Sequence, residues 1–198
     1  MRARLEIPLF LMAGLFASSA GLSTAQKAVS CCVASYFAEQ ASPRAAAPTP
    51  EPPPCSAAPY RQFDFWLGEW DVVDTAGKPA GHNRIVSVFD GCALQENWQS
   101  AQGGRGTSLN VYDAVTQHWH QTWIDDHGGL LELNGGLEDG KMILVGARPS
   151  VKEKGTRLIH RITWTPLAGE KVRQFWEASK NEGRTWTTVF DGTYVRKK

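Results

Sequence analysis

The chain has 198 residues and a mass of 21.8 kDa, enough for one ordinary domain with additional segments. It carries 21 lysine and arginine residues against 20 aspartate and glutamate residues, a formal net charge of +1. This balance provides no basic stripe to neutralise phosphates, which argues against a nucleic-acid partner and against electrostatic binding to a membrane surface.

The first 25 residues have the order of a secretory signal peptide. Two arginines within the first four positions precede an apolar run that ends near Leu22, and small residues follow. We therefore expect cleavage near Ala25 and an exported protein, periplasmic or secreted. Removal of 1–25 takes away two arginines and one glutamate and leaves 19 basic and 19 acidic side chains. The run is short for a membrane span, and a retained membrane anchor is the alternative.

Residues 26–59 are predicted to be a disordered linker. They contain seven of the eleven prolines, together with many alanines and serines. Such a segment has too few large apolar groups to offset the entropy lost on ordering. Cys31 follows Ala-Val-Ser, a poor match to the sequence expected before a lipidated cysteine, and lipidation there is the less favoured alternative.

The four cysteines are Cys31, Cys32, Cys55 and Cys92. An exported chain with an even number of cysteines permits disulfides. The first two are adjacent and poorly placed to bridge each other. We expect a Cys55–Cys92 bridge, which would stabilise by about 3–4 kcal/mol in the chain-entropy description. A buried free Cys92 is the alternative.

Residues 60–198 have the pattern of an all-β domain. All eight tryptophans lie between Trp66 and Trp186, and runs rich in Val, Ile, Thr, Trp and Tyr alternate with Gly, Asn and Asp. The expected strands cover 70–73, 82–89, 93–99, 107–112, 117–124, 130–135, 142–147, 157–165, 171–179 and 185–195. Their close spacing predicts a sandwich or barrel, and hairpin residues such as Asp139-Gly140 predict antiparallel pairing of neighbours.

One expected strand places aromatic and amide side chains on the same face. Alternation between Gln117 and Trp123 groups Trp119, Gln121 and Trp123. A packed core disfavours an amide, because burying it costs energy unless it is hydrogen-bonded. A cavity lined by aromatic rings with a few polar groups accommodates it, so this face is a candidate ligand-binding surface.

Four motifs carry a resemblance to known proteins. Gly68-Glu69-Trp70 is similar to the Gly-x-Trp that opens lipocalin-like (calycin) barrels. The span 61–196 resembles a family of uncharacterised exported bacterial proteins with the motif FDFWLGEW. Its motifs occur here, in order, at residues 63–70, 91–94, 119–123 and 190–194. The resemblance implies an antiparallel up-and-down barrel of about ten strands, and it implies no established activity.

The resemblance also suggests how one barrel end is closed. Phe63, Trp66, Leu67 and Trp70 recur at helical spacing, which suits a short helical turn laid against that end. In lipocalin-like barrels the tryptophan is covered by a late arginine, and Arg196 has the comparable position here. We expect a cation–π contact of about 1 kcal/mol between Arg196 and Trp70. A solvated Arg196 near the chain end is the alternative.

Metal and haem sites are weaker candidates. His118 and His120 share a strand face and could bind a metal with a third ligand, for which residues 125–127 lie nearby. That face points away from Trp119 and Trp123, which favours a solvated surface. Haem ligation is the other possibility, by analogy with other ten-stranded barrels. The candidate ligands are His82, His120, His127 and His160.

No catalytic residue, metal or cofactor is assigned. Glu96, Glu132 and Glu177 lie inside expected strands, but their spacing does not show which of them meet. The chain has no Gly-x-Ser-x-Gly and no phosphate-binding glycine-rich unit between strand and helix. We therefore lean against an enzyme.

The leading hypothesis is an exported barrel that holds a small, mostly apolar ligand. The alternatives are an envelope structural or interaction module without ligand and, less favoured, a haem- or metal-binding protein or a secreted enzyme. The residues expected to line the ligand site are Glu96, Asn110, Trp119, Gln121, Trp123, Arg161 and Glu177.

Overall fold

The computed structural model describes residues 51–197. The signal peptide expected at 1–25 and most of the linker expected at 26–59 lie outside this range. In the described part, three short helical segments accompany ten strands. The helical segments are α1 (Ala58–Arg61), η1 (Asp64–Trp66) and η2 (Phe89–Gly91).

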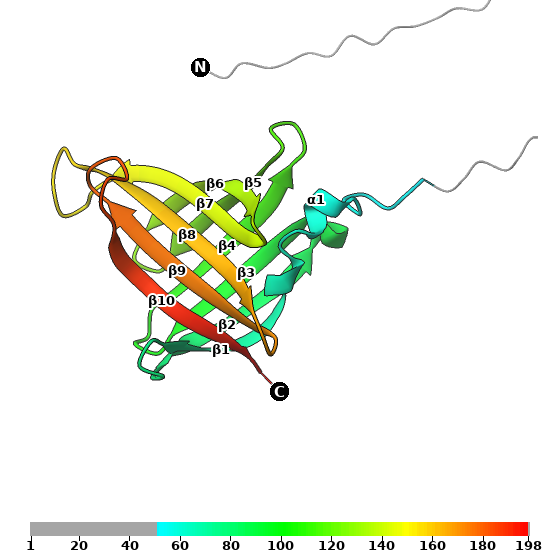
Figure 1. Cartoon of the computed structure of the whole chain (residues 1–198), viewed down its shortest axis with the longest axis horizontal. Coiled ribbons are helices and arrows are strands. Elements are labelled where there is room, and N and C mark those ends of the chain that lie inside the picture. Colours follow the sequence, from blue (N-terminus) through cyan, green and yellow to red (C-terminus); the bar gives the residue numbers. More distant parts are fainter. Residues whose placement is uncertain (1–50, 198) are drawn as a thin grey trace, which may run out of the picture. The chain divides into compact units, whose positions relative to one another are not determined.

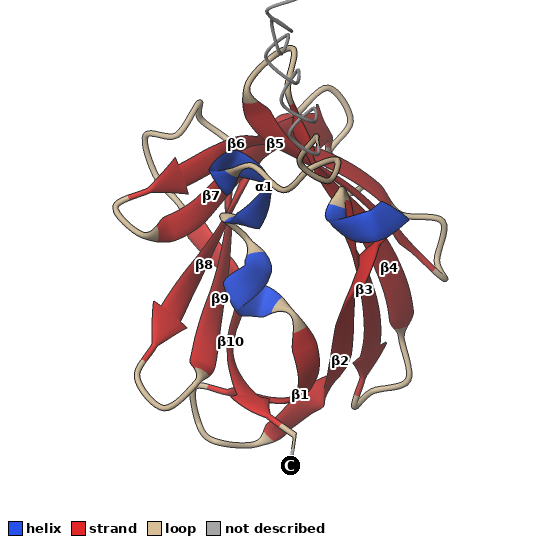
Figure 2. Cartoon of the chain, turned by 90° about the vertical axis from the view of Figure 1, so that its right-hand side faces the viewer, coloured by secondary structure: helices blue, strands red, loops and turns tan. Residues whose placement is uncertain are grey.

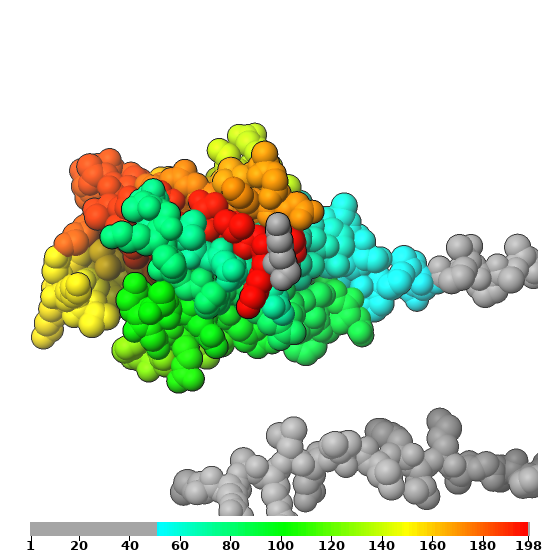
Figure 3. Space-filling view, turned by 90° about the horizontal axis from the view of Figure 1, so that it is seen from below, coloured from blue at the N-terminus to red at the C-terminus, as the bar shows by residue number. Residues whose placement is uncertain are grey.

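The ten strands form one closed antiparallel barrel in chain order (Figure 1). They are β1 (Gly68–Asp74), β2 (Pro79–Val88), β3 (Ala93–Ser100), β4 (Arg105–Asp113), β5 (His118–Asp125), β6 (Leu130–Glu138), β7 (Lys141–Pro149), β8 (Arg157–Leu167), β9 (Lys171–Ser179) and β10 (Thr187–Arg196). Pairing of β1 with β10 completes the barrel, and Figure 3 shows the red atoms of β10 against the green-blue atoms of the first strands. The predicted ten-stranded antiparallel barrel, with a short helical turn before its first strand, is confirmed.

Alternation of side chains explains why these segments form a barrel with a buried inner face. In β8 the buried residues His160, Ile162 and Trp164 alternate with more exposed neighbours. The β6–β7 hairpin turns at Asp139 and Gly140, whose φ angles of 48° and 74° suit the two-residue turn that matches strand twist.

The two ends of the barrel differ. Connections alternate between the ends, and α1, η1 and η2 gather at one of them, which Figure 2 shows with the helical segments in blue. We call this the closed end. The other, the loop end, carries the connections 75–78, 101–104, 126–129, 150–156 and 180–186. In Figure 1 the loops at 150–156 (yellow) and 180–186 (orange-red) lie on the left, opposite α1.

An aromatic plug fills the closed end. The rings of Phe63 and Trp66 stack with centroids 4.9 Å apart, and both residues are fully buried. Phe63 meets the rings of Trp119 and Trp164 edge-on at 5.6 and 5.2 Å. Gln62 accepts a hydrogen bond from Nε1 of Trp119 at 3.1 Å, which ties the helical segment to β5.

Trp70 is covered as expected. The guanidinium of Arg196 lies 4.4 Å from the ring centroid of Trp70, so the predicted cation–π contact is confirmed. Nε1 of Trp70 donates to the backbone oxygen of Trp66 at 3.0 Å. Gly68 lies beneath the guanidinium with a φ of 137°, and a Cβ at this position would collide with Arg196.

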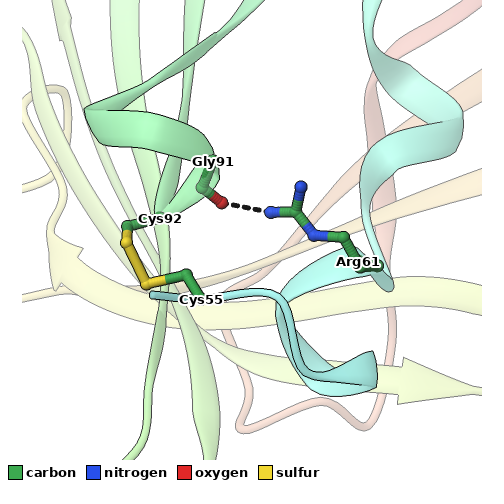
Figure 4. Close-up of a disulfide and its surroundings, with 4 residues drawn as sticks. All are labelled: Cys55, Arg61, Gly91 and Cys92. Atoms are coloured by element: carbon green, nitrogen blue, oxygen red, sulfur yellow. Dashed lines mark hydrogen bonds between the residues drawn. A yellow bond between two sulfur atoms is a disulfide. The ribbon is translucent and has the colours of Figure 1, made fainter. Parts of the chain in front are cut away.

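The predicted disulfide between Cys55 and Cys92 is confirmed (Figure 4). It joins the segment ahead of α1 to the start of β3, across a sequence separation of 37 residues. Nη2 of Arg61 donates to the backbone oxygen of Gly91 in the same region. These two links hold the helical segments at the closed end of the barrel.

Removing the bridge should measurably destabilise the protein. We expect replacement of both Cys55 and Cys92 by serine to lower the free energy of unfolding by about 3 kcal/mol, because the unfolded chain loses a cross-link. Urea denaturation of the two proteins measures the difference, and wild type under reducing agent should match the double variant. A loss below about 1 kcal/mol would show that the bridge adds little to stability.

Candidate functional site

The inner face of three strands repeats one short pattern. An acid or amide side chain is followed two residues later by tryptophan. The three pairs are Glu96 with Trp98 in β3, Gln121 with Trp123 in β5, and Gln174 with Trp176 in β9. Because these strands run in the same direction, each indole lies two residues, about 7 Å along its strand, nearer the loop end than its polar partner.

These residues surround a cavity of about 210 Å³ in the half of the barrel nearer the loop end. Its wall is mostly apolar and aromatic, with a few polar groups. The lining residues are Glu96, Trp98, Gln121, Trp123, Leu131, Ile162, Gln174, Trp176, Val189, Phe190 and Tyr194. Val189 is 48% exposed, so this part of the wall meets solvent.

A glycine makes room for one of the indoles. Gly106 of β4 pairs with Trp98 of β3, and a Cβ on Gly106 would collide with the ring of Trp123 on β5. The indole of Trp123 therefore packs against bare backbone of its neighbouring strand. This close approach leaves interior volume that a larger residue at position 106 would take.

Glu96 lies at the centre of a polar layer beneath the cavity. Its Oε1 accepts a hydrogen bond from Nδ2 of Asn83 at 2.7 Å, and its Oε2 accepts one from Oγ of Ser108 at 2.6 Å. Glu96 is 4% exposed. The carboxyl group thus joins β2, β3 and β4 across their inner faces.

Two arms extend this layer around the barrel. On one side, Nδ2 of Asn110 donates to Ser108 at 3.0 Å, and Nε2 of Gln121 donates to Oδ1 of Asn110 at 2.7 Å. On the other, Nδ2 of Asn83 also donates to Oη of Tyr194 at 3.2 Å, and Tyr194 donates to Oε1 of Gln174. One continuous chain of hydrogen bonds therefore runs from β5 to β9.

Burial controls the protonation of this layer. Removal from water raises the pKa of Glu96 to about 7, although the hydrogen bonds from Ser108 and Asn83 act in the opposite direction. Burial, with the negative charge of Glu96 nearby, raises the pKa of Tyr194 well above its ordinary value. No lysine or arginine is buried within residues 51–197. The carboxylate therefore has no buried cationic side chain to balance it.

His160 is a further buried titratable group on the inner face. Its Nδ1 accepts a hydrogen bond from Nε1 of Trp176 at 3.0 Å, which places the proton of the neutral ring on Nε2. Burial, assisted by the charge of Arg148, lowers the pKa of His160 to about 4. The imidazole is therefore neutral at neutral pH and supplies no positive charge to the cavity.

The structure brings together only part of the residue set expected from sequence. Glu96, Gln121 and Trp123 line the cavity, as expected. Asn110 is buried in the polar layer below it. Trp119 faces inward but belongs to the aromatic plug at the closed end, because Phe63 and Gln62 occupy the space beside it.

The expectation that Arg161 and Glu177 face the interior is wrong. Arg161 alternates with the buried His160 and Ile162, and Glu177 follows the cavity residue Trp176, so both project from the outer face. There Nη2 of Arg161 contacts Oε2 of Glu177 at 2.9 Å. The guanidinium also lies 4.0 Å from the ring centroid of Trp186.

Sequence reasoning missed most of the cavity wall. Trp98, Gln174 and Trp176 were detectable, since they repeat the polar-x-Trp pattern already noticed at Gln121 and Trp123. Phe190 and Tyr194 carry no such signal. They face the cavity because closure of the barrel brings β10 beside β9 and β1.

The residues considered for a metal site or for paired carboxylates do not come together in the structure. His118 and His120 lie on the opposite side of β5 from Trp119 and Gln121. Residues 51–197 contain no cluster of three or more His, Cys, Asp or Glu that could hold a metal ion. Glu132 and Glu177 project outward, so neither pairs with Glu96. Over the same range, no helix has the length and apolar character needed to cross a membrane.

Comparisons with known proteins do not assign the chain to a family. No protein-family model matches the chain. No curated protein matches it either. The resemblance to exported proteins with the FDFWLGEW motif is therefore unsupported by these comparisons. The ten-stranded antiparallel barrel is consistent with a calycin-like fold.

Proposed function

We propose that this protein is exported and binds a small, mostly apolar ligand in the cavity near the loop end. The observation that carries the proposal is an aromatic cavity with a polar floor in a barrel whose opposite end is plugged. Sites of this kind combine apolar walls with a few polar groups that fix orientation. The volume of about 210 Å³ suits a molecule with one or two rings.

The disulfide supports export. Cys55 and Cys92 form a bond that is typical of oxidising compartments and rare in reducing ones. This fits the basic start, apolar run and small residues of 1–25. Location in the periplasm or outside the cell is thus part of the proposal.

The second candidate is an interaction module of the cell envelope without ligand. Exposed apolar side chains on the outer face of β4 to β6 favour it, among them Leu109, Ile124 and Leu130 at 48%, 50% and 50% exposure. A module without ligand needs no space inside the barrel, and the cavity therefore favours the first candidate. We therefore place ligand binding first.

Filling the cavity should strongly weaken the binding of a small ligand. We expect benzyl alcohol, a small neutral aromatic probe, to bind wild type in saturation-transfer NMR. Leu131→Trp should weaken binding about tenfold or more, because the indole takes the volume that the probe needs. The matched control is Leu130→Trp, the same change on the outward-facing neighbour.

Circular dichroism should confirm that both variants are folded. Equal binding to Leu131→Trp and wild type would place the probe elsewhere and contradict the proposed site. Absence of binding to wild type would count against an apolar site of this size.

A further inference from the structure

Glu96 is a cavity carboxyl group without a counter-charge. Each of its oxygens accepts one hydrogen bond from a neutral donor, and a carboxylate oxygen can accept two. Acceptor capacity therefore remains on a group that lines the cavity. A buried charge is stable only when paired, and within 51–197 no buried lysine or arginine provides the pair.

The rest of the wall also favours positive charge. Trp98, Trp123, Trp176 and Phe190 present aromatic rings to the cavity, and the rings of Trp98 and Phe190 meet edge-on at 6.0 Å. The faces of such rings carry negative electrostatic potential and attract ammonium groups. No lysine, arginine or histidine among the described residues lines the cavity, so an anion would find no partner of opposite charge in this part of the chain.

We propose that the ligand is a small amine with an aromatic or other apolar body, whose protonated nitrogen donates to the carboxylate of Glu96. This inference rests on the proposed ligand-binding function and names its ligand class. The apolar body would occupy the space between the three indoles. The ammonium group would meet the polar layer, where the ligand supplies the charge that the protein lacks.

Near neutral pH, the charge that an amine would meet in the cavity is set by Glu96, because the other groups that face Glu96 are neutral. Asn83 from β2 and Ser108 from β4 do not ionise. Tyr194 from β10 is uncharged near neutral pH, because burial raises its pKa well above its ordinary value. His160 on β8 is neutral there as well, since burial lowers its pKa to about 4. The pKa of Glu96, about 7, then makes amine binding weaken about tenfold per pH unit as the pH falls below 7.

Three probes of one size test the inference: benzylamine, benzyl alcohol and benzoate. At pH 8, isothermal titration of wild type should show benzylamine binding about tenfold tighter than benzyl alcohol, with benzoate weakest. Glu96→Gln should remove the preference for benzylamine, so that benzylamine and benzyl alcohol bind with similar affinity, and circular dichroism should show that this variant is folded. Glu132→Gln, which neutralises an outward-facing carboxylate, should behave as wild type.

The outcomes separate the inference from the function on which it rests. Equal affinity of wild type for benzylamine and benzyl alcohol, or a preference for benzoate, would overturn the amine proposal and leave ligand binding intact. Retention of the benzylamine preference in Glu96→Gln would overturn it too. Failure of all three probes to bind would count against the ligand-binding function itself.

Discussion

Trp66→Ala is expected to lower the free energy of unfolding by about 3–5 kcal/mol, the usual cost of truncating a large buried aromatic. The side chain is fully buried, stacks on Phe63 and lies with its ring centroid 5.3 Å from that of Trp164. Its removal leaves a void at the centre of the plug, and the rings around it are fixed by neighbours on several strands. Urea or thermal unfolding measures the loss.

A tryptophan outside the plug provides a matched control for the loss of Trp66. Trp186 is half-buried on the outer surface, where Arg161 lies over its ring. Trp186→Ala should cost only about 1 kcal/mol, the worth of a solvent-facing cation–π contact. A loss at Trp66 no larger than the loss at Trp186 would contradict the view that Trp66 helps to close the barrel.

The second large effect is a pair of opposite pH dependences of stability. The pKa of Glu96 is raised from 4.5 to about 7 in the folded protein, so the folded state holds a proton that the unfolded state releases. The resulting stabilisation is complete below pH 4.5 and is lost as the pH rises through 7, a change of about 3 kcal/mol.

His160 acts in the other direction. Its pKa is lowered from 6.5 to about 4, so the unfolded state takes up a proton that the folded state refuses. Stability falls as the pH drops from 6.5 towards 4, by about 2 kcal/mol after allowance for solvent screening near the loop end. In wild type the two effects partly cancel between pH 4.5 and 6.5.

Single substitutions should reveal how each group alone makes the free energy of unfolding depend on pH. Glu96→Gln is expected to become steadily less stable on acidification from pH 7 to 4. His160→Asn, which keeps an acceptor for Nε1 of Trp176, is expected to become less stable as the pH rises from 4.5 to 8. Chemical denaturation across this range measures both. Parallel curves for the two variants would show that these groups do not titrate as their burial requires.

Much of the barrel was predictable because strand patterns are local. Ten runs of β-branched and aromatic residues marked the ten strands, and Asp139-Gly140 marked a hairpin. The start of β2 was missed because Pro79 and Gly81 carry no strand propensity. The outward position of Arg161 could have been predicted from the alternation of side chains along the strand, because its neighbours His160 and Ile162 face inward.

Depth along the barrel was not predictable in the same way. Trp119 and Trp123 share one face, but Trp119 joins the plug and Trp123 the cavity, because the helical segment at Phe63 enters from only one end. The surroundings of Glu96 depend on distant pairings as well. Asn83 bonds both Glu96 and Tyr194, and the second partner is 111 residues away in the chain. Such contacts follow from register and closure, which local patterns do not encode.

The most direct test of the central claim is native mass spectrometry of the protein purified from its own host. We expect wild type to carry a small molecule that is released on denaturation, and its composition should include a basic nitrogen. The Leu130→Trp variant should retain this molecule, whereas Leu131→Trp should show the bare polypeptide mass. A bare mass for wild type, or the same bound molecule on Leu131→Trp, would contradict a ligand site in the cavity.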